Sequence, residues 1–228
     1  MSMAKRLVSE GLGSALLLAV VVGSGIMAER LAAGNTAIAL LANSIATGAG
    51  LIALILMLGT ISGAHFNPVV TLSAAWQKNI PWPEVLPYIV VQIAGAFAGV
   101  AMAHGMFGEP LFFASAHVRT GWAQWWSESV ASFGLIAVII STSRTRPGVT
   151  PFAVAAYITA AYWFTSSTSF ANPAVTLARA ASDTFAGIRP ADVPGFIIAQ
   201  LCGAALATGL FSWLYPAPAV THTEQAEG

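Results

Sequence analysis

The feature that most constrains this chain is the absence of Asp, Glu, Lys and Arg from long parts of it. Six stretches lack all four residue types: 11–28, 31–77, 85–108, 129–143, 147–178 and 193–223. A helix needs about 20 largely apolar residues to cross a bilayer. Only 8% of the residues are charged, whereas soluble domains carry about 25%. We therefore predict an all-α membrane protein rather than a soluble domain.

The predicted membrane segments follow from these stretches. Six transmembrane helices are expected near 7–29, 37–60, 84–107, 123–143, 151–167 and 193–214. The stretches 31–77 and 147–178 are longer than one crossing needs, and each contains an Asn-Pro pair. We expect the surplus chain to form two short re-entrant helices, near 67–77 and 173–182.

The sequence also contains an internal duplication. Three segments recur in the same order: Ser9-Glu10 as Ser127-Glu128, the hexapeptide 67–72 as 172–177, and residues 92–95 as 200–203. Because each copy holds three spans, the second copy must enter the membrane upside down. Such an inverted repeat places a site at the bilayer midplane. We predict one channel domain over 1–228, with halves of about 5–110 and 122–215 and a polar tail over 216–228.

The two Asn-Pro pairs suit the start of a helix. Asparagine is a favoured N-cap, and proline at the first helical position loses no needed hydrogen bond. Two half-length helices entering from opposite sides would bring Asn67 and Asn172 together at the midplane. Each helix N-terminus carries about +0.5 of a charge, which repels cations, while each amide can donate to a neutral solute. This geometry favours a pore for uncharged cargo.

At this point the sequence resembles a known family. Residues 62–71, Ser-Gly-Ala-His-Phe-Asn-Pro-Val-Val-Thr, and the triplet Asn172-Pro173-Ala174 are similar to the two signature loops of the aquaporin/aquaglyceroporin (major intrinsic protein) family. The resemblance covers roughly 5–215. It implies six helices plus two half-helices, one pore per subunit and a homotetramer. Val69, which follows Pro68, stands where alanine is usual, an apolar change that should leave the capping amide in place.

The resemblance also implies a constriction built by four positions, here Thr47, Ala160, Ser169 and Val175. The fourth position is normally arginine, so Val175 is the main departure from the family pattern. The segment 165–170 matches the family poorly, and Phe170 is the alternative for the wall. Small residues at Thr47 and Ala160 predict a wide filter.

A wide filter without arginine suggests which solutes would pass. We expect water and small uncharged solutes such as glycerol, urea and metalloid hydroxides including arsenite. An arginine-less bacterial branch that this chain resembles, the S-type aquaporins, is linked to arsenic resistance. Arg179 lies four residues after Val175, on the same helical face, so its guanidinium could reach the lumen, or it could instead face solvent or cap a carbonyl group.

Three further polar residues are candidates for roles near the pore. Glu10 and Glu128 are the acids expected near or within spans, and in the resembled family the equivalent acids hold the buried loop backbone. A proton relay is the alternative. His65, two residues before Asn67, should border the pore and either order the loop or gate it by pH.

Several function classes are disfavoured by composition. The net charge is zero and there are no basic runs, which argues against nucleic acid as a partner. Cys202 is the single cysteine, so a cysteine-built metal site is not expected, nor is a cofactor. There is no Gly-x-Ser-x-Gly motif, so we predict no enzyme. A proton-coupled secondary transporter is the alternative function, since inverted repeats also serve alternating access.

The Lys and Arg residues suggest an orientation. With the N-terminus inside, the residues placed in the cytoplasm are Lys5, Arg6, Lys78, Arg144 and Arg146, and those placed outside are Arg30, Arg119, Arg179 and Arg189. This small excess favours cytoplasmic termini. We predict an integral protein of a bacterial inner membrane.

Overall fold

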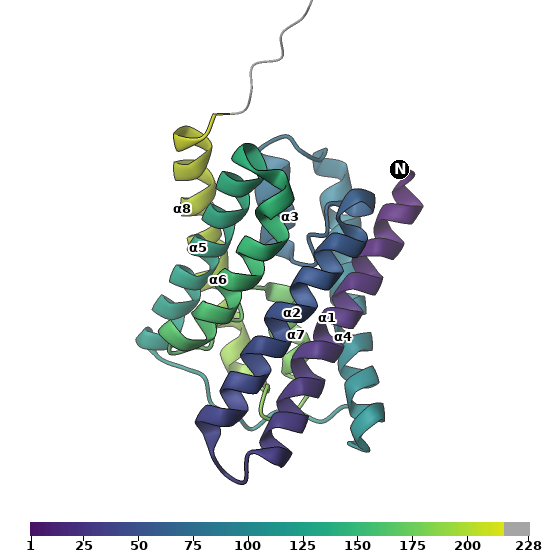
Figure 1. Cartoon of the computed structure of the whole chain (residues 1–228), viewed down its shortest axis with the longest axis vertical. Helices are drawn as coiled ribbons and strands as arrows, with labels where there is room; N and C mark the ends of the chain where they lie inside the picture. The colour runs from purple at the N-terminus through teal and green to yellow at the C-terminus, as the bar shows by residue number, and fades with distance from the viewer. Residues whose placement is uncertain (217–228) are drawn as a thin grey trace, which may run out of the picture.

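The structure is a computed structural model and describes residues 1–216. Within this range the chain forms eight α-helices, joined by loops and two short 3-10 turns (Figure 1). The helices are α1 (Met3–Leu31), α2 (Thr36–Ser62), α3 (Pro68–Trp76), α4 (Trp82–Phe107), α5 (Trp122–Thr145), α6 (Thr150–Phe164), α7 (Pro173–Arg179) and α8 (Val193–Leu214). The turns are η1 (Pro147–Val149) and η2 (Pro190–Asp192). The all-α prediction is therefore confirmed, and the predicted polar tail lies almost wholly outside the described residues.

Five helical segments are long and apolar enough to cross a membrane. They are Met3–Leu31, Thr36–Ser62, Trp82–Phe107, Trp122–Thr145 and Pro190–Leu214. α6 has 15 residues, which gives a length of about 22 Å at 1.5 Å per residue. It ends at Phe164, three residues before the predicted boundary, because the backbone of Thr165 is extended.

The long helices pack in two similar pairs, α1 with α4 and α5 with α8. Glycine allows the close approach in both pairs. A Cβ on Gly95 would lie 2.2 Å from the Gly11 carbonyl oxygen, and a Cβ on Gly203 would lie 2.1 Å from the Ser129 carbonyl oxygen. Neither distance is tolerable, so any larger residue would push the paired helices apart.

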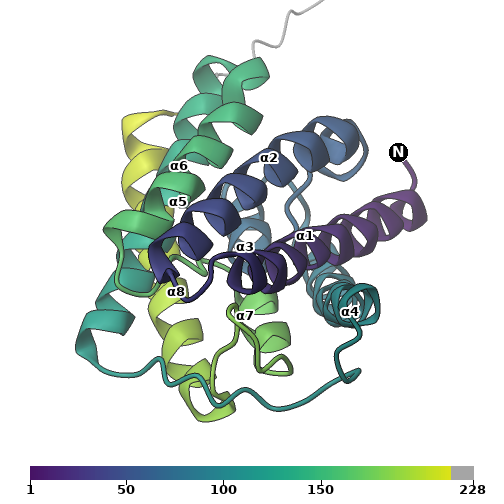
Figure 2. The same cartoon turned by 60° about the horizontal axis from the view of Figure 1, so that its bottom comes forward.

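The two short helices lie inside the bundle (Figures 1 and 2). α3 lies in the half of the molecule that holds the N-terminus, and α7 lies in the opposite half. Proline occupies the first turn of each helix, and an asparagine precedes it as the N-cap. α7 ends at Arg179, earlier than the predicted residue 182. The N-terminus and the end of α8 lie at the same end of the bundle (Figure 1).

The outer surface is apolar over much of the bundle. Large exposed apolar side chains occur on all the long helices, for example Leu56 on α2, Leu86 on α4 and Leu206 on α8. Trp82 and Trp122 are exposed at the first residues of α4 and α5. An apolar surface of this extent, with tryptophan at helix ends, is typical of a protein surrounded by lipid.

Candidate pore between two Asn-Pro loops

Asn67 and Asn172 cap the two short helices with their side-chain oxygens. Asn67 Oδ1 accepts a hydrogen bond from the Val69 N–H at 3.0 Å. Asn172 Oδ1 accepts from the N–H groups of Ala174 and Val175, at 3.0 and 3.3 Å. Pro68 and Pro173 stand at the first helical position, where no donor is needed. Both asparagines are almost fully buried.

The amide nitrogens of the same asparagines join the two loops. Asn67 Nδ2 donates to the Ala171 carbonyl at 2.8 Å, and Asn172 Nδ2 donates to the Phe66 carbonyl at 2.8 Å. Each amide therefore reaches across to the residue that precedes the other asparagine. Since each Nδ2 carries two hydrogens, one N–H per asparagine is left for a solute. The two asparagines therefore lie against each other's loops.

Glu10 on α1 holds the backbone of the first loop just before the Asn67 cap. Its carboxylate accepts from the backbone N–H of His65 at 2.9 Å and of Phe66 at 2.7 Å. The side chains of Ser62 and Gln92 also donate to it, at 2.6 and 2.8 Å. The carboxylate is completely buried. The four hydrogen bonds from these donors therefore replace the hydrogen bonds to water that burial removes.

Glu128 on α5 holds the second loop in the same way. It accepts from the backbone N–H of Phe170 and of Ala171, both at 2.9 Å, and from Gln200 Nε2 at 2.6 Å. Gln200 also donates to Thr176 Oγ1 at 2.9 Å. Gln92 makes the equivalent contact with Thr71 at 2.9 Å in the first half. The duplicated Glu and Gln residues thus fix the two loops through two equivalent sets of contacts, one in each half.

The clamped backbone adopts the left-handed conformation without glycine. Phe66 and Ala171, which precede the two asparagines, have φ of 49° and 48°. Ala64 and Ser169, two residues earlier, have φ of 50° and 52°. This conformation is costly for residues with a Cβ and persists only where surrounding contacts impose it. Here it turns two successive N–H groups toward one carboxylate and the following carbonyl toward the opposite asparagine.

One cavity of about 280 Å³ is lined by both asparagines. Gln77, Asn79, Ser143 and Thr150 line it at the α3 end. Tyr162, Ser169, Phe170 and Arg179 line it at the α7 end. Between them the wall is largely apolar, with Leu17, Val21, Leu51, Ile55, Leu135, Ile136, Ile139, Ile140, Val154, Ile158 and Val175. Polar groups are therefore concentrated at the two ends and at the asparagines.

Three of the four predicted filter residues line this cavity: Thr47, Ser169 and Val175. Ala160 does not, because its side chain is exposed on the outside of α6. Tyr162 lines the cavity instead, and its hydroxyl lies 3.2 Å from Thr47 Oγ1. Val154, Ile158 and Tyr162 form one row at four-residue spacing, and Ala160 lies off that row. This row was the signal in the sequence that could have identified Tyr162.

Arg179 lies at the α7 end of the cavity, stacked on Phe170. Its guanidinium carbon is 3.4 Å from the centre of the Phe170 ring, and its Nε donates to the Ala186 carbonyl. The side chain is 2% exposed to solvent. Both residues line the cavity, so the structure places Arg179 beside the lumen, with one of its nitrogens donating to a carbonyl group, and not on the solvent-exposed surface.

Arg119, which sequence reasoning did not single out, supports the same ring. Its guanidinium carbon is 5.0 Å from the Phe170 ring centre. Its Nε donates to the Gly187 carbonyl at 2.8 Å and its Nη1 to the Ser167 carbonyl at 3.2 Å. Burial lowers the pKa of this guanidinium from its usual value. Arg119 lies in the connection between α4 and α5, where nothing in the local sequence indicates this contact.

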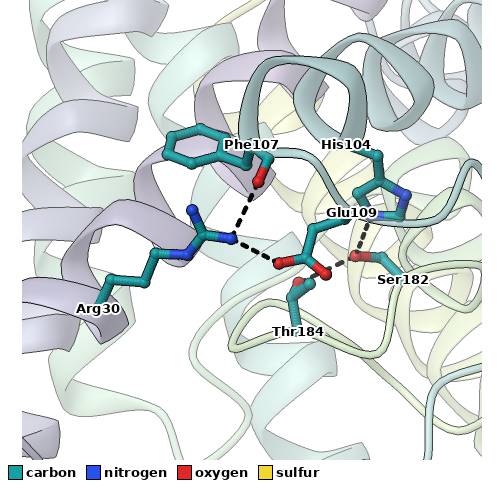
Figure 3. Close-up of polar contacts among 6 residues, drawn as sticks. All are labelled: Arg30, His104, Phe107, Glu109, Ser182 and Thr184. Atoms are coloured by element: carbon teal, nitrogen blue, oxygen red, sulfur yellow. Dashed lines mark hydrogen bonds and ion pairs between the residues drawn. The ribbon is translucent and has the colours of Figure 1, made fainter.

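The segment after α7, which supplies the Ala186 carbonyl, is fixed to the end of α4 (Figure 3). His104 Nε2 lies 2.8 Å from Ser182 Oγ, which lies 2.9 Å from Thr184 Oγ1. In the same view, Arg30 on α1 pairs with Glu109 at 2.8 Å. These contacts hold the outer loops close to the ends of the long helices.

His65 borders the cavity on the α3 side of the asparagines. Its Nδ1 lies 3.1 Å from Thr71 Oγ1, and its ring centre lies 5.5 Å from that of Tyr88. These contacts orient the imidazole within its own loop. Among residues 1–216, no group of three or more His, Cys, Asp or Glu side chains is placed to hold a metal ion.

Comparisons with known proteins agree with this geometry. A family model described as Major intrinsic protein matches residues 1–164. The aquaglyceroporin AqpS of Rhizobium meliloti (strain 1021) is 55% identical over 92% of this chain and 90% of its own length. The aquaporin NIP2-3 of Zea mays is 32% identical over 81% of this chain and 62% of its own length. The X-ray structure of the aquaglyceroporin from Plasmodium falciparum has the same fold, with a TM-score of 0.64 at 16% identity, and covers 94% of this chain and 96% of its own.

Proposed function

The chain belongs to the major intrinsic protein family, and we propose from this premise that it is a passive pore for water, glycerol and other small uncharged solutes. It is an integral membrane channel and not an enzyme. Two of the similar proteins are named aquaglyceroporins, which supports glycerol as one of the solutes.

The observation that carries the proposal is the crossed pair of asparagine amides beside one continuous cavity. Both short helices direct their N-termini at this junction, so two partial positive charges lie where a solute passes. A neutral solute can accept a hydrogen bond from each free amide N–H. An ion would lose its hydration against mostly apolar walls, at an idealised cost on the order of 20 kcal/mol. The junction therefore favours neutral cargo.

The proposed topology has six crossings, including the short α6, and two re-entrant half-helices, α3 and α7. The domain is one channel over 1–228, with inverted halves of about 5–110 and 122–215. The matching pairs α1–α4 and α5–α8 support this division. We infer cytoplasmic termini from the distribution of Lys and Arg, and a bacterial inner membrane from the rhizobial relative. A homotetramer is the expected assembly.

The proposed filter is built by Thr47, Ser169 and Val175, with Tyr162 in the place first given to Ala160. Valine in place of an arginine removes a fixed charge and five donors from that position. This should admit urea and metalloid hydroxides such as arsenite in addition to glycerol. Because Tyr162 is larger than Ala160, we expect a narrower opening than the one predicted from small residues at both Thr47 and Ala160.

Glu10 and Glu128 are proposed to act as structural clamps for the loops. Their oxygens already accept from two backbone N–H groups and at least one side chain each. A proton-coupled transporter would need one of these carboxylates to be free to exchange its proton with the substrate pathway. Their contacts therefore favour the channel over the transporter.

Stopped-flow measurement of purified protein in liposomes tests the proposal. We expect water and glycerol permeability above that of empty liposomes, unaffected by an imposed proton gradient. Asn67→Ala and Asn172→Ala should lower solute flux, because each removes an amide donor and a helix cap. Asn35→Ala is the matched control, since Asn35 caps α2 on the exposed surface with the same two backbone contacts that Asn172 makes in α7. Flux that depends on the proton gradient would contradict the channel.

A further inference from the structure

Arg179 carries two hydrogen-bonding groups that no other part of the described chain uses. Its Nε donates to the Ala186 carbonyl, but within residues 1–216 neither Nη1 nor Nη2 has a hydrogen-bond partner. The side chain is almost completely buried and lines the cavity. Nη1 and Nη2 therefore face the lumen, where they can donate to a molecule in the cavity.

The charge of this guanidinium also lacks an acidic partner. The ion pairs among the described residues are Arg6–Glu84, Arg30–Glu109 and Arg189–Asp192. Glu128 holds the neighbouring loop, but its oxygens already accept from Phe170, Ala171 and Gln200. A cation over an aromatic ring gains about 2 kcal/mol when desolvated, which is less than burial of an unpaired charge costs.

Two more features make this end of the cavity suited to an anion. Arg119 places a second guanidinium against the Phe170 ring, and the Nε and Nη1 of this guanidinium donate to carbonyl groups rather than to carboxylates. Ser169, which lines the cavity, has a buried hydroxyl with no hydrogen-bond partner. The cavity end thus combines the Arg179 guanidinium, whose Nη1 and Nη2 have no protein partner, with the free Ser169 hydroxyl, and Arg119 places a second positive charge against the Phe170 ring that lines it.

We propose that the α7 end of the cavity binds a small monocarboxylate, such as acetate or formate, through Nη1 and Nη2 of Arg179. A guanidinium presents parallel N–H groups that match the two oxygens of a carboxylate. The unpartnered Ser169 hydroxyl supplies an additional donor at the same end of the cavity. This proposal deepens the proposed function and rests on it, because the bound anion occupies the path of neutral solutes. The anion does not cross, since the apolar wall beyond Val175 cannot replace its hydration.

Inhibition of glycerol flux tests this site. Proteoliposomes are assayed at about pH 7.5, where acetate is ionised, with sodium acetate outside. A bulky sulfonate salt of equal osmolarity serves as the reference. At an acetate concentration equal to its Kd, half of the pores are occupied, so glycerol permeability should fall about twofold. In parallel, saturation-transfer NMR of the acetate methyl group measures binding to the detergent-solubilised protein without requiring flux.

Three variants separate the possible outcomes. Arg179→Gln should abolish both inhibition and saturation transfer, and Arg179→Lys should weaken them because lysine cannot bind in a bidentate manner. Arg189→Gln, which removes a partly exposed and paired arginine, should change neither. Normal glycerol flux with no inhibition and no acetate signal in the wild type would overturn the anion site alone. An acetate signal dependent on Arg179 in a protein that passes no neutral solute would overturn the proposed function alone.

Discussion

The two Asn-Pro loops are the same where they face the protein and different where they face the lumen. On the protein side, each has a buried glutamate beneath two backbone N–H groups and a glutamine that links this glutamate to a helix threonine. On the lumen side, position for position, His65 corresponds to Phe170 and Ala74 to Arg179. All four of these residues line the cavity.

This difference distinguishes the residues that hold the loop backbone from the residues that determine which solutes pass. The duplicated residues hold the strained backbone, and any change there would disturb the asparagine junction on which both loops depend. His65 and Phe170 contribute only their backbone N–H groups to these contacts, so the side chains at the lumen positions can diverge between the halves. The result is a pore with a guanidinium and an aromatic ring at the α7 end and an imidazole at the α3 end.

The largest effect is expected from the clamps. Glu10→Gln and Glu128→Gln each replace a carboxylate oxygen by an NH₂ group that faces a donor. Hydrogen bonds to charged groups are worth about 1.5–3 kcal/mol each, so both variants should lose most of their folded protein. Glu10→Gln should be the more damaging, since Glu10 accepts from four donors and Glu128 from three.

Thermal stability in detergent, followed by size-exclusion chromatography, measures this difference. Glu29→Gln on the exposed end of α1 is the control and should behave as the wild type. Equal stability of wild type and both clamp variants would show that the shared scaffold does not depend on the carboxylates.

The next effect concerns the filter. Val175→Arg places a second guanidinium beside Arg179 and should reduce glycerol permeability by about tenfold, which corresponds to about 1.4 kcal/mol of added barrier. Water permeability should fall less, because water is smaller. Val70→Arg is the matched change at the corresponding position of the first loop. Stopped-flow assays of both variants compare the two ends, and unchanged glycerol permeability in Val175→Arg would refute our account of the filter.

A smaller effect on stability is expected where each loop packs against its long helix, α1 for the first loop and α5 for the second. Gly13 faces the Phe66 ring, and a Cβ on Gly13 would lie 1.9 Å from a ring carbon. The corresponding residues in the second half are Ala131 and Ala171. Gly13→Ala should therefore destabilise the protein by about 1–3 kcal/mol through overpacking.

Phe66→Ala combined with Gly13→Ala recreates the pair found in the second half. The double variant should recover stability relative to Gly13→Ala in a denaturation assay in mixed micelles. Additive losses would mean that the two sites do not interact.

The smallest effect is expected at Tyr162. Tyr162→Phe removes the hydroxyl that contacts Thr47 while keeping the ring, so glycerol permeability should change by about twofold or less, the equivalent of about 0.4 kcal/mol. Tyr157→Phe is the control, because the Tyr157 hydroxyl donates to the Val130 carbonyl and does not line the cavity. A tenfold change in Tyr162→Phe alone would make this hydroxyl a principal filter group.

Some details of the α7 side could not be predicted from the sequence. The position of Tyr162 depends on where α6 ends, and α6 stops early because the following residues must bring the Phe170 and Ala171 N–H groups to Glu128. Ala160 was expected in the filter from the family resemblance, which does not report how α6 is rotated. The contact of Arg119 with Phe170 joins residues that are distant in the chain, so no local sequence pattern predicts it.

The sequence by itself determined the apolar helices, the duplication and the two asparagine caps, because these depend on local composition, helix-start chemistry and order along the chain. Only the tertiary structure decided which residue of α6 faces the lumen and where the side chain of Arg179 lies. The rotation of α6, the left-handed turns before the asparagines and the stacking of Arg179 on Phe170 each result from contacts between segments far apart in the sequence, which no local preference can fix.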